Sequence, residues 1–193
     1  MNKNTIIIAG GAAVIVIGAL LWWLLSRSSS DAVNVEKFNL LKDETVPMRL
    51  KVVVRSDGSA QVAVKFFDVD GKAVGRLELP YSGGGITLRI LDVDVNGRHL
   101  YFPEEMVQCA SPDTLTQQLQ QYYVMDGFPM IYSSQVADAG LQDEILRLYS
   151  RILDGDSGTF FTATPIESTL NDPMERVNYS FSVKADGGVR LGT

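Results

Sequence analysis

Residues 47–103 read PMRLKVVVRSDGSAQVAVKFFDVDGKAVGRLELPYSGGGITLRILDVDVNGRHLYFP, and turn signals divide this stretch at a constant interval. Asp57-Gly58, Asp70-Gly71, Gly83-Gly84-Gly85 and Asn96-Gly97 begin 13 residues apart. Asp-Gly and Asn-Gly suit two-residue hairpin turns, because both central positions of such a turn need positive φ. The spacing therefore predicts a meander of antiparallel β-strands.

Between these turns the side chains alternate in polarity, which is the two-residue period of a strand with one buried face. The alternation places Arg49, Lys51, Gln61 and Lys65 on the outward face. The expected buried face consists of Met48, Leu50, Val52, Val54, Ala60, Val62, Val64 and Phe66. The apolar positions change phase after Ile90, which predicts a β-bulge near Ile90-Leu91.

Two helices are predicted beyond this meander. Ser111-Pro112-Asp113 supplies a capping oxygen, a proline and a first-turn carboxylate for a helix over residues 112–125. A second helix is predicted over residues 141–153, where an apolar face repeats at helical spacing and Gly155 is placed to end the helix. Strands are then expected over residues 159–164, 176–184 and 189–191.

These patterns together predict an α+β fold that is mainly antiparallel β. A sandwich or a half-open barrel, with a two-helix insertion that closes one face or end, buries both the strand faces and the helix faces.

The chain begins with a segment that predicts one N-terminal transmembrane helix. Residues 5–25, TIIIAGGAAVIVIGALLWWLL, contain no charged side chain. At about 1.5 Å per residue, a helix of this length matches a hydrocarbon core about 30 Å thick. Trp22-Trp23 at its end suit the membrane–water boundary. A cleaved signal peptide is the alternative, but its apolar region is normally about 7–15 residues long, so an uncleaved anchor is favoured.

The predicted organisation is therefore a short cytoplasmic tail (1–4), a transmembrane anchor (5–25), a linker (26–46) and an extracytoplasmic β-rich domain (47–193). Lys3 and the terminal amine precede the span, whereas Arg27 alone follows it closely. Because cations are enriched on the cytoplasmic side, this difference predicts a periplasmic location for the domain.

The domain is predicted to be acidic. Two of the 17 Lys and Arg residues precede residue 31, whereas all 23 Asp and Glu residues lie within residues 31–193, which therefore have a net charge of −8. This charge repels phosphate backbones, which excludes nucleic acid as an expected partner. Cys109 is the only cysteine, so no intrachain disulfide or cysteine-based zinc site can form. No cofactor is predicted.

One motif has the beginning of a calcium-binding pattern. Asp92, Asp94 and Asn96, followed by Gly97, match the first six positions of an EF-hand loop. The twelfth position requires a bidentate glutamate and is Pro103 here. A strand followed by a hairpin turn explains the same residues better. Calcium binding remains an alternative, with Glu104 or Glu105 as substitute ligands.

A second motif, Gly155-Asp156-Ser157-Gly158, resembles the nucleophile segment of chymotrypsin-like serine proteases. That resemblance implies a serine activated by a histidine. The only histidine, His99, lies in a segment unlike the family's histidine motif, and no histidine follows the serine. The acidic pairs Glu104-Glu105 and Asp143-Glu144 leave a carboxylate-only hydrolase as a further possibility, which requires two carboxylates about 5–10 Å apart in a cleft.

The segment over residues 122–132 is rich in aromatic side chains and methionine, which are enriched at protein contact surfaces. Packing in the core is the alternative for the same residues. The candidate partner-binding residues are Tyr122, Tyr123, Phe128, Met130 and Tyr132.

The anchor and the weakness of every catalytic pattern favour a non-enzyme, although enzymatic activity stays open. The predicted function is that of a membrane-anchored accessory or assembly protein of the cell envelope, acting through protein–protein contacts. An extracytoplasmic sensor module that binds a small molecule or glycan is the alternative.

Overall fold

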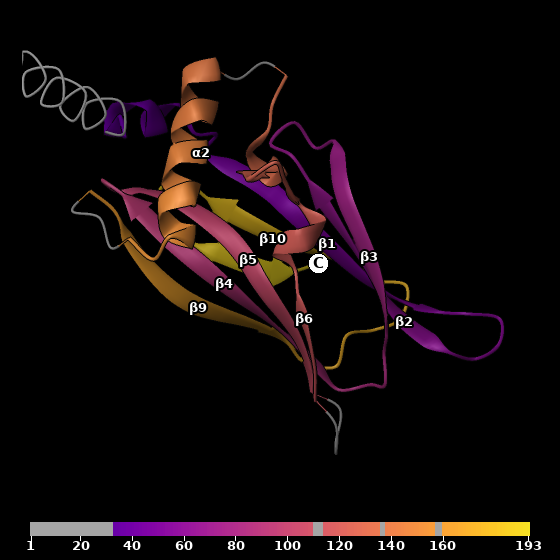
Figure 1. Ribbon diagram of the computed structural model, residues 1–193. Helices are drawn as coiled ribbons and strands as arrows, with labels where there is room; N and C mark the ends of the chain where they lie inside the picture. Colours follow the sequence, from indigo (N-terminus) through magenta and orange to yellow (C-terminus); the bar gives the residue numbers. More distant parts are fainter. Residues whose placement is uncertain (1–32, 110–113, 136–137, 157–159) are drawn as a thin grey trace, which may run out of the picture. The chain divides into compact units, whose positions relative to one another are not determined.

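Two antiparallel sheets form most of the fold in the computed structural model, which describes residues 33–109, 114–135, 138–156 and 160–193 (Figure 1). The five-stranded sheet has the order β11 (Val189–Gly192), β10 (Asn178–Lys184), β1 (Glu44–Val54), β2 (Ala60–Phe67), β3 (Ala73–Pro80). The four-stranded sheet has the order β6 (Thr114–Gln118), β5 (Arg98–Cys109), β4 (Gly85–Val95), β9 (Thr162–Leu170).

The described residues also contain several short elements and one α-helix. The helix is α2 (Ala139–Leu153), and β7 (Val124–Met125) pairs with β8 (Phe128–Pro129). The 3-10 helices are η1 (Val35–Leu40), η2 (Gln120–Tyr122) and η3 (Met130–Tyr132).

The predicted turns lie where the sequence placed them, but only Asn96-Gly97 is the predicted two-residue turn, with positive φ at both central positions. Asp57 and Asp70 do not have positive φ, and the loops at Asp57-Gly58 and Asp70-Gly71 are longer. Gly58, Gly71 and Gly97 have φ of 82°, 80° and 80°, in the left-handed region that favours glycine. These turns close the hairpins β1–β2, β2–β3 and β4–β5. The Gly83-Gly84-Gly85 segment has a different role, because the chain crosses there from the five-stranded sheet to the four-stranded one.

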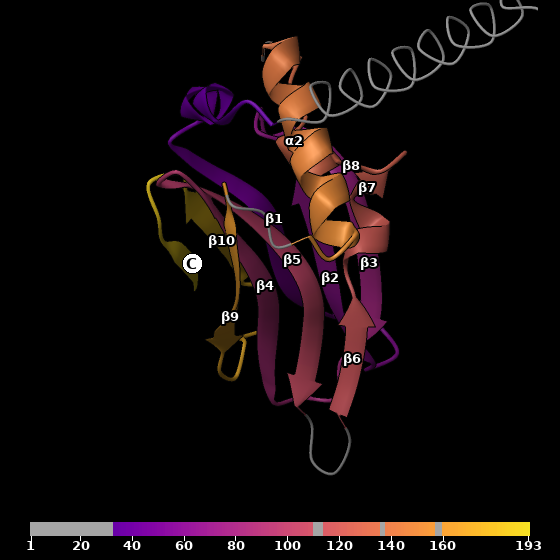
Figure 2. The same ribbon diagram turned by 60° about the vertical axis from the view of Figure 1, so that its left-hand side comes forward.

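The two sheets lie face to face, and their apolar inner faces form the core (Figures 1 and 2). The buried inner residues of the five-stranded sheet are Met48, Leu50, Val52, Val62, Val64, Phe66, Leu77, Tyr179, Phe181 and Val183. Ile86, Leu88, Ile90 and Met106 are the corresponding residues of the four-stranded sheet. The alternation predicted for β1 and β2 is confirmed, with Val54 and Ala60 only half-buried beside their turn.

Helix α2 explains the change of phase in β4. Its Tyr149 ring packs 5.1 Å from the ring of Phe102, which lies opposite Leu91 in the β4–β5 ladder. The helix therefore covers one end of the outer face of the four-stranded sheet, and Val93 and Val95 of β4 are buried there. The same face is exposed further along β4, at Arg89. A bulge does occur in the β4–β5 ladder, but the extra residue is Glu104 on β5, between the partners of Arg89 and Ile90.

The prediction of a two-helix insertion is wrong in its first helix. Residues 114–118 form β6, which pairs with Glu105–Cys109 along the edge of β5. Leu115 and Leu119 would share one face of the predicted helix, but Leu115 is 44% exposed whereas Leu119 is fully buried. Pairing with an open sheet edge outweighed the weak helical pattern. The second predicted helix is confirmed as α2, which begins at Ala139 and ends at Leu153.

The compact unit begins at Asn34, so residues 34–46 of the predicted linker are part of the folded structure. Phe38 in η1 is fully buried, and β1 already begins at Glu44. The predicted tail (1–4) and transmembrane anchor (5–25) lie outside the described residues. Within the described residues, no helix has the length and apolar character needed to cross a membrane.

Candidate functional site

The segment predicted to contact a partner contributes two of its five candidate residues to the core. Tyr123 is 1% exposed and Tyr132 is 8% exposed. The Tyr123 hydroxyl donates a hydrogen bond of 2.9 Å to a backbone carbonyl of β5, so this ring joins the segment to the four-stranded sheet. Tyr122, Phe128 and Met130 are half-buried and remain partly accessible at the surface.

The candidate calcium ligands do not converge on one point. The Asp92 carboxylate lies 2.8 Å from Nδ1 of His99, and the Asp94 carboxylate accepts a hydrogen bond of 2.6 Å from the Gly97 N–H. Asn96 lies at the exposed turn. The substitute ligand Glu105 pairs with Arg89, three residues from Asp92 along β4 and therefore on the opposite face of the sheet. Among the described residues, no group of three His, Cys, Asp or Glu side chains is arranged to hold a metal ion.

His99 is held in a structural network. Besides its contact with Asp92, its ring stacks on Tyr101 at 6.0 Å between centroids. Its backbone N–H donates a hydrogen bond of 2.8 Å to the carbonyl oxygen of Ala185, in the turn between β10 and β11. Ser157, the candidate nucleophile, lies outside the described residues.

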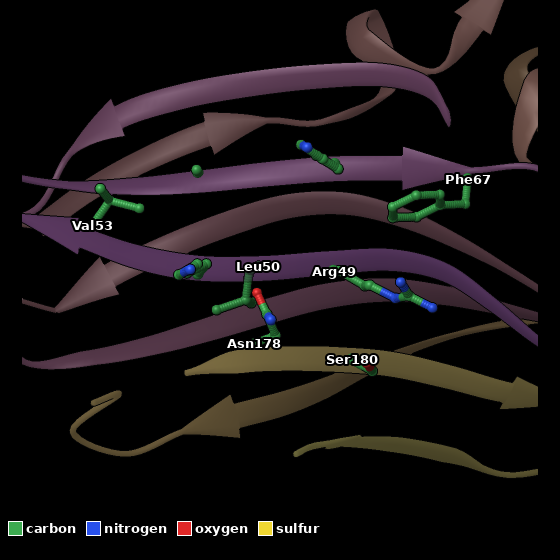
Figure 3. A pocket seen from close by; sticks show the side chains of 9 residues that line it. Arg49, Leu50, Val53, Phe67, Asn178 and Ser180 are labelled. Atoms are coloured by element: carbon green, nitrogen blue, oxygen red, sulfur yellow. The ribbon is translucent and has the colours of Figure 1, made fainter. Parts of the chain in front are cut away.

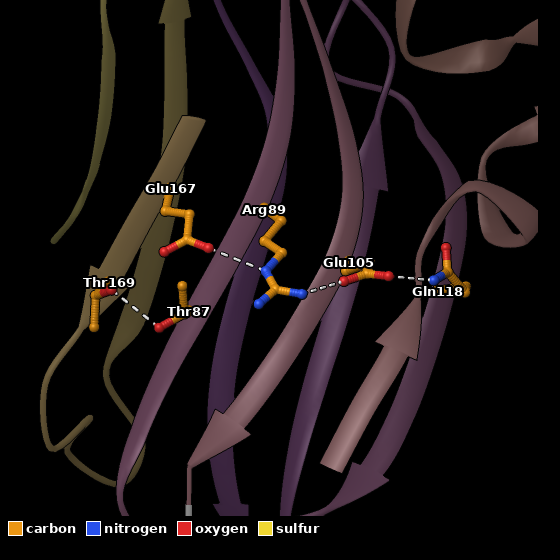
Figure 4. Close-up of polar contacts among 6 residues, drawn as sticks. All are labelled: Thr87, Arg89, Glu105, Gln118, Glu167 and Thr169. Atoms are coloured by element: carbon orange, nitrogen blue, oxygen red, sulfur yellow. Dashed lines mark hydrogen bonds and ion pairs between the residues drawn. The ribbon is translucent and has the colours of Figure 1, made fainter. Parts of the chain in front are cut away.

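The acidic pair Glu104-Glu105 is divided between two environments. Burial and the neighbouring Glu105 raise the pKa of the Glu104 carboxyl above its usual value. Glu105 is part of a polar row across the outer face of the four-stranded sheet, in which Arg89 pairs with Glu105 at 2.9 Å and with Glu167 at 3.0 Å (Figure 4). Gln118 donates to the second oxygen of Glu105. Each charged side chain of this row therefore has a partner of opposite charge on a neighbouring strand.

The outer face of the five-stranded sheet is arranged differently and contains an open groove of about 470 Å³ (Figure 3). The groove lies over β1, with β2 on one side and β10 on the other. The lining residues are Arg49, Leu50, Lys51, Val53, Ala63, Lys65, Phe67, Asn178 and Ser180.

Three cations stand in one row across this face. Arg49 on β1 lies directly opposite Lys65 on β2, and Lys65 lies directly opposite Arg76 on β3. Lys51 adds a fourth positive charge two residues along β1 from Arg49. Like charges directly opposite each other destabilise a sheet, so this arrangement opposes folding slightly.

No carboxylate of the described residues pairs with these four cations. The only interaction found for them is that of Arg49, whose guanidinium carbon lies 5.0 Å from the centroid of the Phe67 ring. The outward carboxylate of β3, Glu78, pairs instead with Arg55 at 3.4 Å. A positive groove thus lies on a domain whose net charge is −8.

The groove has the chemistry to bind an anion. Arginine presents a planar fork of donors that matches a carboxylate, lysine supplies a compact charge, and Asn178 and Ser180 add neutral hydrogen-bonding groups at the edge. Its lining contains no carboxylate, histidine or cysteine, which are the side chains that most often act as acids, bases or nucleophiles.

Sequence reasoning placed Arg49, Lys51 and Lys65 on the outward face but assigned them no function. Alternation along each strand gives the face, whereas the register between strands brings the three cations together. A two-residue turn at Asp57-Gly58 would set Arg49 opposite Phe66. The observed turn pairs Arg55 with Ser59 and so sets Arg49 opposite Lys65, which the turn signal alone did not predict.

A comparison with known families gives one match. The model of the family described as Domain of unknown function (DUF4307) matches residues 2–101, which is more than half of the 193 residues. The match includes Arg49, Lys51, Lys65 and Arg76 and ends before α2. No protein with a curated description and no solved structure matches the chain.

Proposed function

Since this chain belongs to the DUF4307 family, which is described as a domain of unknown function, we propose its role from its own residues. It is a membrane-anchored, non-enzymatic accessory protein of the cell envelope. It acts by holding another protein against the outer face of its five-stranded sheet.

The unpaired row of Arg49, Lys65 and Arg76 is the observation on which this proposal rests. On the four-stranded sheet, the equivalent outward row pairs its arginine with two glutamates. The two faces belong to one domain and meet the same solvent, so solubility alone does not explain why only one of them lacks counter-charges. An anionic partner would supply the missing charges when it binds.

The predicted anchor supports the location of this activity. Residues 5–25 would keep the domain at a membrane surface, where a tethered protein meets its partners at a raised effective concentration. The sequence between the predicted anchor and Asn34 is short and rich in serine, so the domain would stay near that surface.

Binding of a small anion or glycan is the second candidate function. The groove volume of about 470 Å³ lies within the range of about 300–1,000 Å³ that is typical of ligand pockets. The groove is open along β1, however, whereas small-molecule sites usually enclose most of the ligand surface. An open groove is better suited to a segment of a larger molecule.

Site-specific crosslinking in intact membranes tests the proposal. A photoreactive amino acid replaces Lys65 in the groove or, as a matched control, Arg147 on the exposed side of α2. After irradiation the full-length protein is solubilised and purified, and its adducts are identified by mass spectrometry. We expect a protein adduct from position 65, absent from position 147 and lost when Arg49→Glu is added.

A protein adduct of equal yield from both positions would contradict the assignment of the contact to this face. Recovery of the intact protein with no protein adduct at position 65 would contradict the accessory function itself. A small-molecule adduct at position 65 alone would favour the second candidate.

A further inference from the structure

We infer that the groove takes an extended acidic segment of the partner protein, with carboxylates at alternate positions along the segment. This inference rests on the proposed function and adds the chemistry and conformation of what is bound. It follows from the direction of the groove, the spacing of its charges and the groups at its two ends.

The groove runs along a strand. Arg49, Lys51 and Val53 share the outward face of β1, and all three line the groove. Side chains two residues apart on a strand are about 6.8 Å apart, so this part of the groove is about 14 Å long. An extended peptide has the same repeat. Its alternate side chains can therefore meet successive positions of β1 in register.

The charges within the groove match this repeat. Arg49 and Lys51 stand one repeat apart on β1, and Lys65 lies beside Arg49 on the neighbouring strand. Contact of the Arg49 guanidinium with the Phe67 ring holds its donor fork over the groove. A carboxylate bound near Arg49 would meet two positive charges, and a carboxylate two residues along the segment would meet Lys51.

The ends of the groove add apolar and neutral contacts. Phe67 lies at the Arg49 end, whereas Val53, which is 36% exposed, lies at the other end. Asn178 and Ser180 stand opposite Lys51 and Arg49 on β10 and supply groups that can bond to a peptide backbone. The occupant would therefore be acidic in its centre and less polar at its ends.

An anionic membrane surface is the competing occupant, because the chain is expected to be anchored. Its many charges would act on the whole domain, whose net charge of −8 opposes adsorption, whereas a short acidic segment meets only the local positive groove. The charges also lie within a groove rather than on a projecting surface.

Three fluorescent hexapeptides test the inference against the full-length protein in neutral detergent, with fluorescence anisotropy as the measurement. The first alternates glutamate and threonine, the second replaces every glutamate with glutamine, and the third has the composition of the first with its glutamates in one block. We expect the alternating peptide to bind most tightly and the glutamine peptide not to bind. Added salt should weaken the binding because the contacts are exposed to solvent.

Variants assign the binding to the groove. The double variant Lys51→Gln with Lys65→Gln should weaken binding of the alternating peptide by about fivefold or more, since each exposed charge pair contributes up to about 1 kcal/mol. Lys72→Gln with Arg147→Gln removes the same charge at positions that do not line the groove, and it should leave the affinity unchanged within about twofold. Circular dichroism checks that both variants are folded.

Equal affinity for the alternating and the blocked peptide would overturn the extended register. Binding to phosphatidylserine–phosphatidylcholine vesicles, lost in the groove variant and without peptide binding, would assign the face to the membrane instead. If no peptide binds but a partner still crosslinks from position 65, the acidic-segment inference fails and the proposed function stands. If crosslinking fails as well, both fail.

Discussion

At the scale of one residue, the Tyr132 hydroxyl bonds backbone groups of β5 that no neighbouring strand of the described residues pairs with. The hydroxyl accepts a hydrogen bond of 2.6 Å from the Tyr101 N–H and donates one of 3.2 Å to the Tyr101 carbonyl oxygen. Both groups are buried, so Tyr132→Phe would leave a donor and an acceptor of β5 without a partner. We expect a loss of about 1–3 kcal/mol in the free energy of unfolding, measured by urea denaturation.

Tyr122→Phe is the matched control, because no hydrogen bond of the Tyr122 hydroxyl is found among the described residues and the ring is half-buried. This variant should unfold at nearly the urea concentration of the original protein. Equal effects of the two substitutions would mean that the Tyr132 hydroxyl does not stabilise β5.

Gly75 is required by a close approach of two backbones rather than by its φ angle. A Cβ atom added at this position on β3 would collide with the carbonyl oxygen of Tyr122 in η2. Gly75→Ala should lower the free energy of unfolding by about 1–3 kcal/mol, because the backbone must move to admit the methyl group. Gly85→Ala is the control, since its nearest heavy atom would lie at 3.6 Å, an ordinary contact. Similar unfolding midpoints for both variants would show that η2 moves freely away from β3.

At the scale of elements, the sequence predicts an element well where the chain's own pattern determines it. The strands β1 and β2 and the helix α2 have strong periods of two and of 3.6 residues, and each was predicted. The ends of β2 and α2 were nearly correct, whereas β1 begins at Glu44, before the predicted start of the domain. Residues 114–118 have no comparable pattern. Their state depends on pairing with the open edge of β5, the strand that precedes them, and this pairing has no signal within residues 114–118 themselves.

The candidate groove follows the same logic. Its cations were predicted to face outward, because alternation is a property of one strand. Their convergence is a property of the register between β1 and β2, which sets Arg49 opposite Lys65. The contribution of β10 was still harder to predict, since Asn178 and Ser180 lie more than a hundred residues after β1.

The row of like charges leads to a prediction for the whole five-stranded sheet. Lys65→Glu would place a carboxylate between Arg49 and Arg76. The four-stranded sheet has the opposite arrangement, with Arg89 between two glutamates. We expect the unfolding free energy at low salt to rise by about 0.2–1 kcal/mol for this exposed site, and binding of the acidic peptide to be lost. The variant would then be more stable but unable to bind. This result is expected if the three cations are kept for binding although they lower the stability of the sheet.

Lys72→Glu makes the same change of charge at the β2–β3 turn and should leave binding intact. If Lys65→Glu lowered the stability instead, the three cations would not be repelling one another in the free protein. The three cations would then need no anionic partner to explain them.

At the scale of the whole molecule, buried tyrosines between the two sheets and α2 set a limit to alkaline stability. Burial raises the pKa of Tyr149 to about 12, and burial also raises the pKa of Tyr123 and Tyr132. An unfolded chain loses these protons near the ordinary value of about 10. Below that pH both states are protonated and the folded state keeps its full advantage. As the pH rises from about 10 to about 12, the unfolded state ionises first and the free energy of unfolding must fall.

Urea denaturation at steps across this range, together with the tyrosinate absorbance, measures the effect. We expect the loss of stability to be smaller in Tyr149→Phe after correction for its lower starting stability, because one of the linked protons is absent. An unfolding free energy that stays constant up to about pH 12 would mean that these hydroxyls ionise equally in both states.

Labelling of one residue, Cys109, can show on which side of the membrane the domain lies. Cys109 is the only cysteine in the chain and is exposed at the end of β5, within the same compact unit as the groove. A maleimide that cannot cross membranes should therefore label the full-length protein in intact cells as completely as in permeabilised cells. Cys109→Ser defines the background, and prior mild reduction keeps the thiol available. Labelling only after permeabilisation would place the domain inside the cell, where a partner in the periplasm is out of reach, and would contradict the proposed envelope function at its first premise.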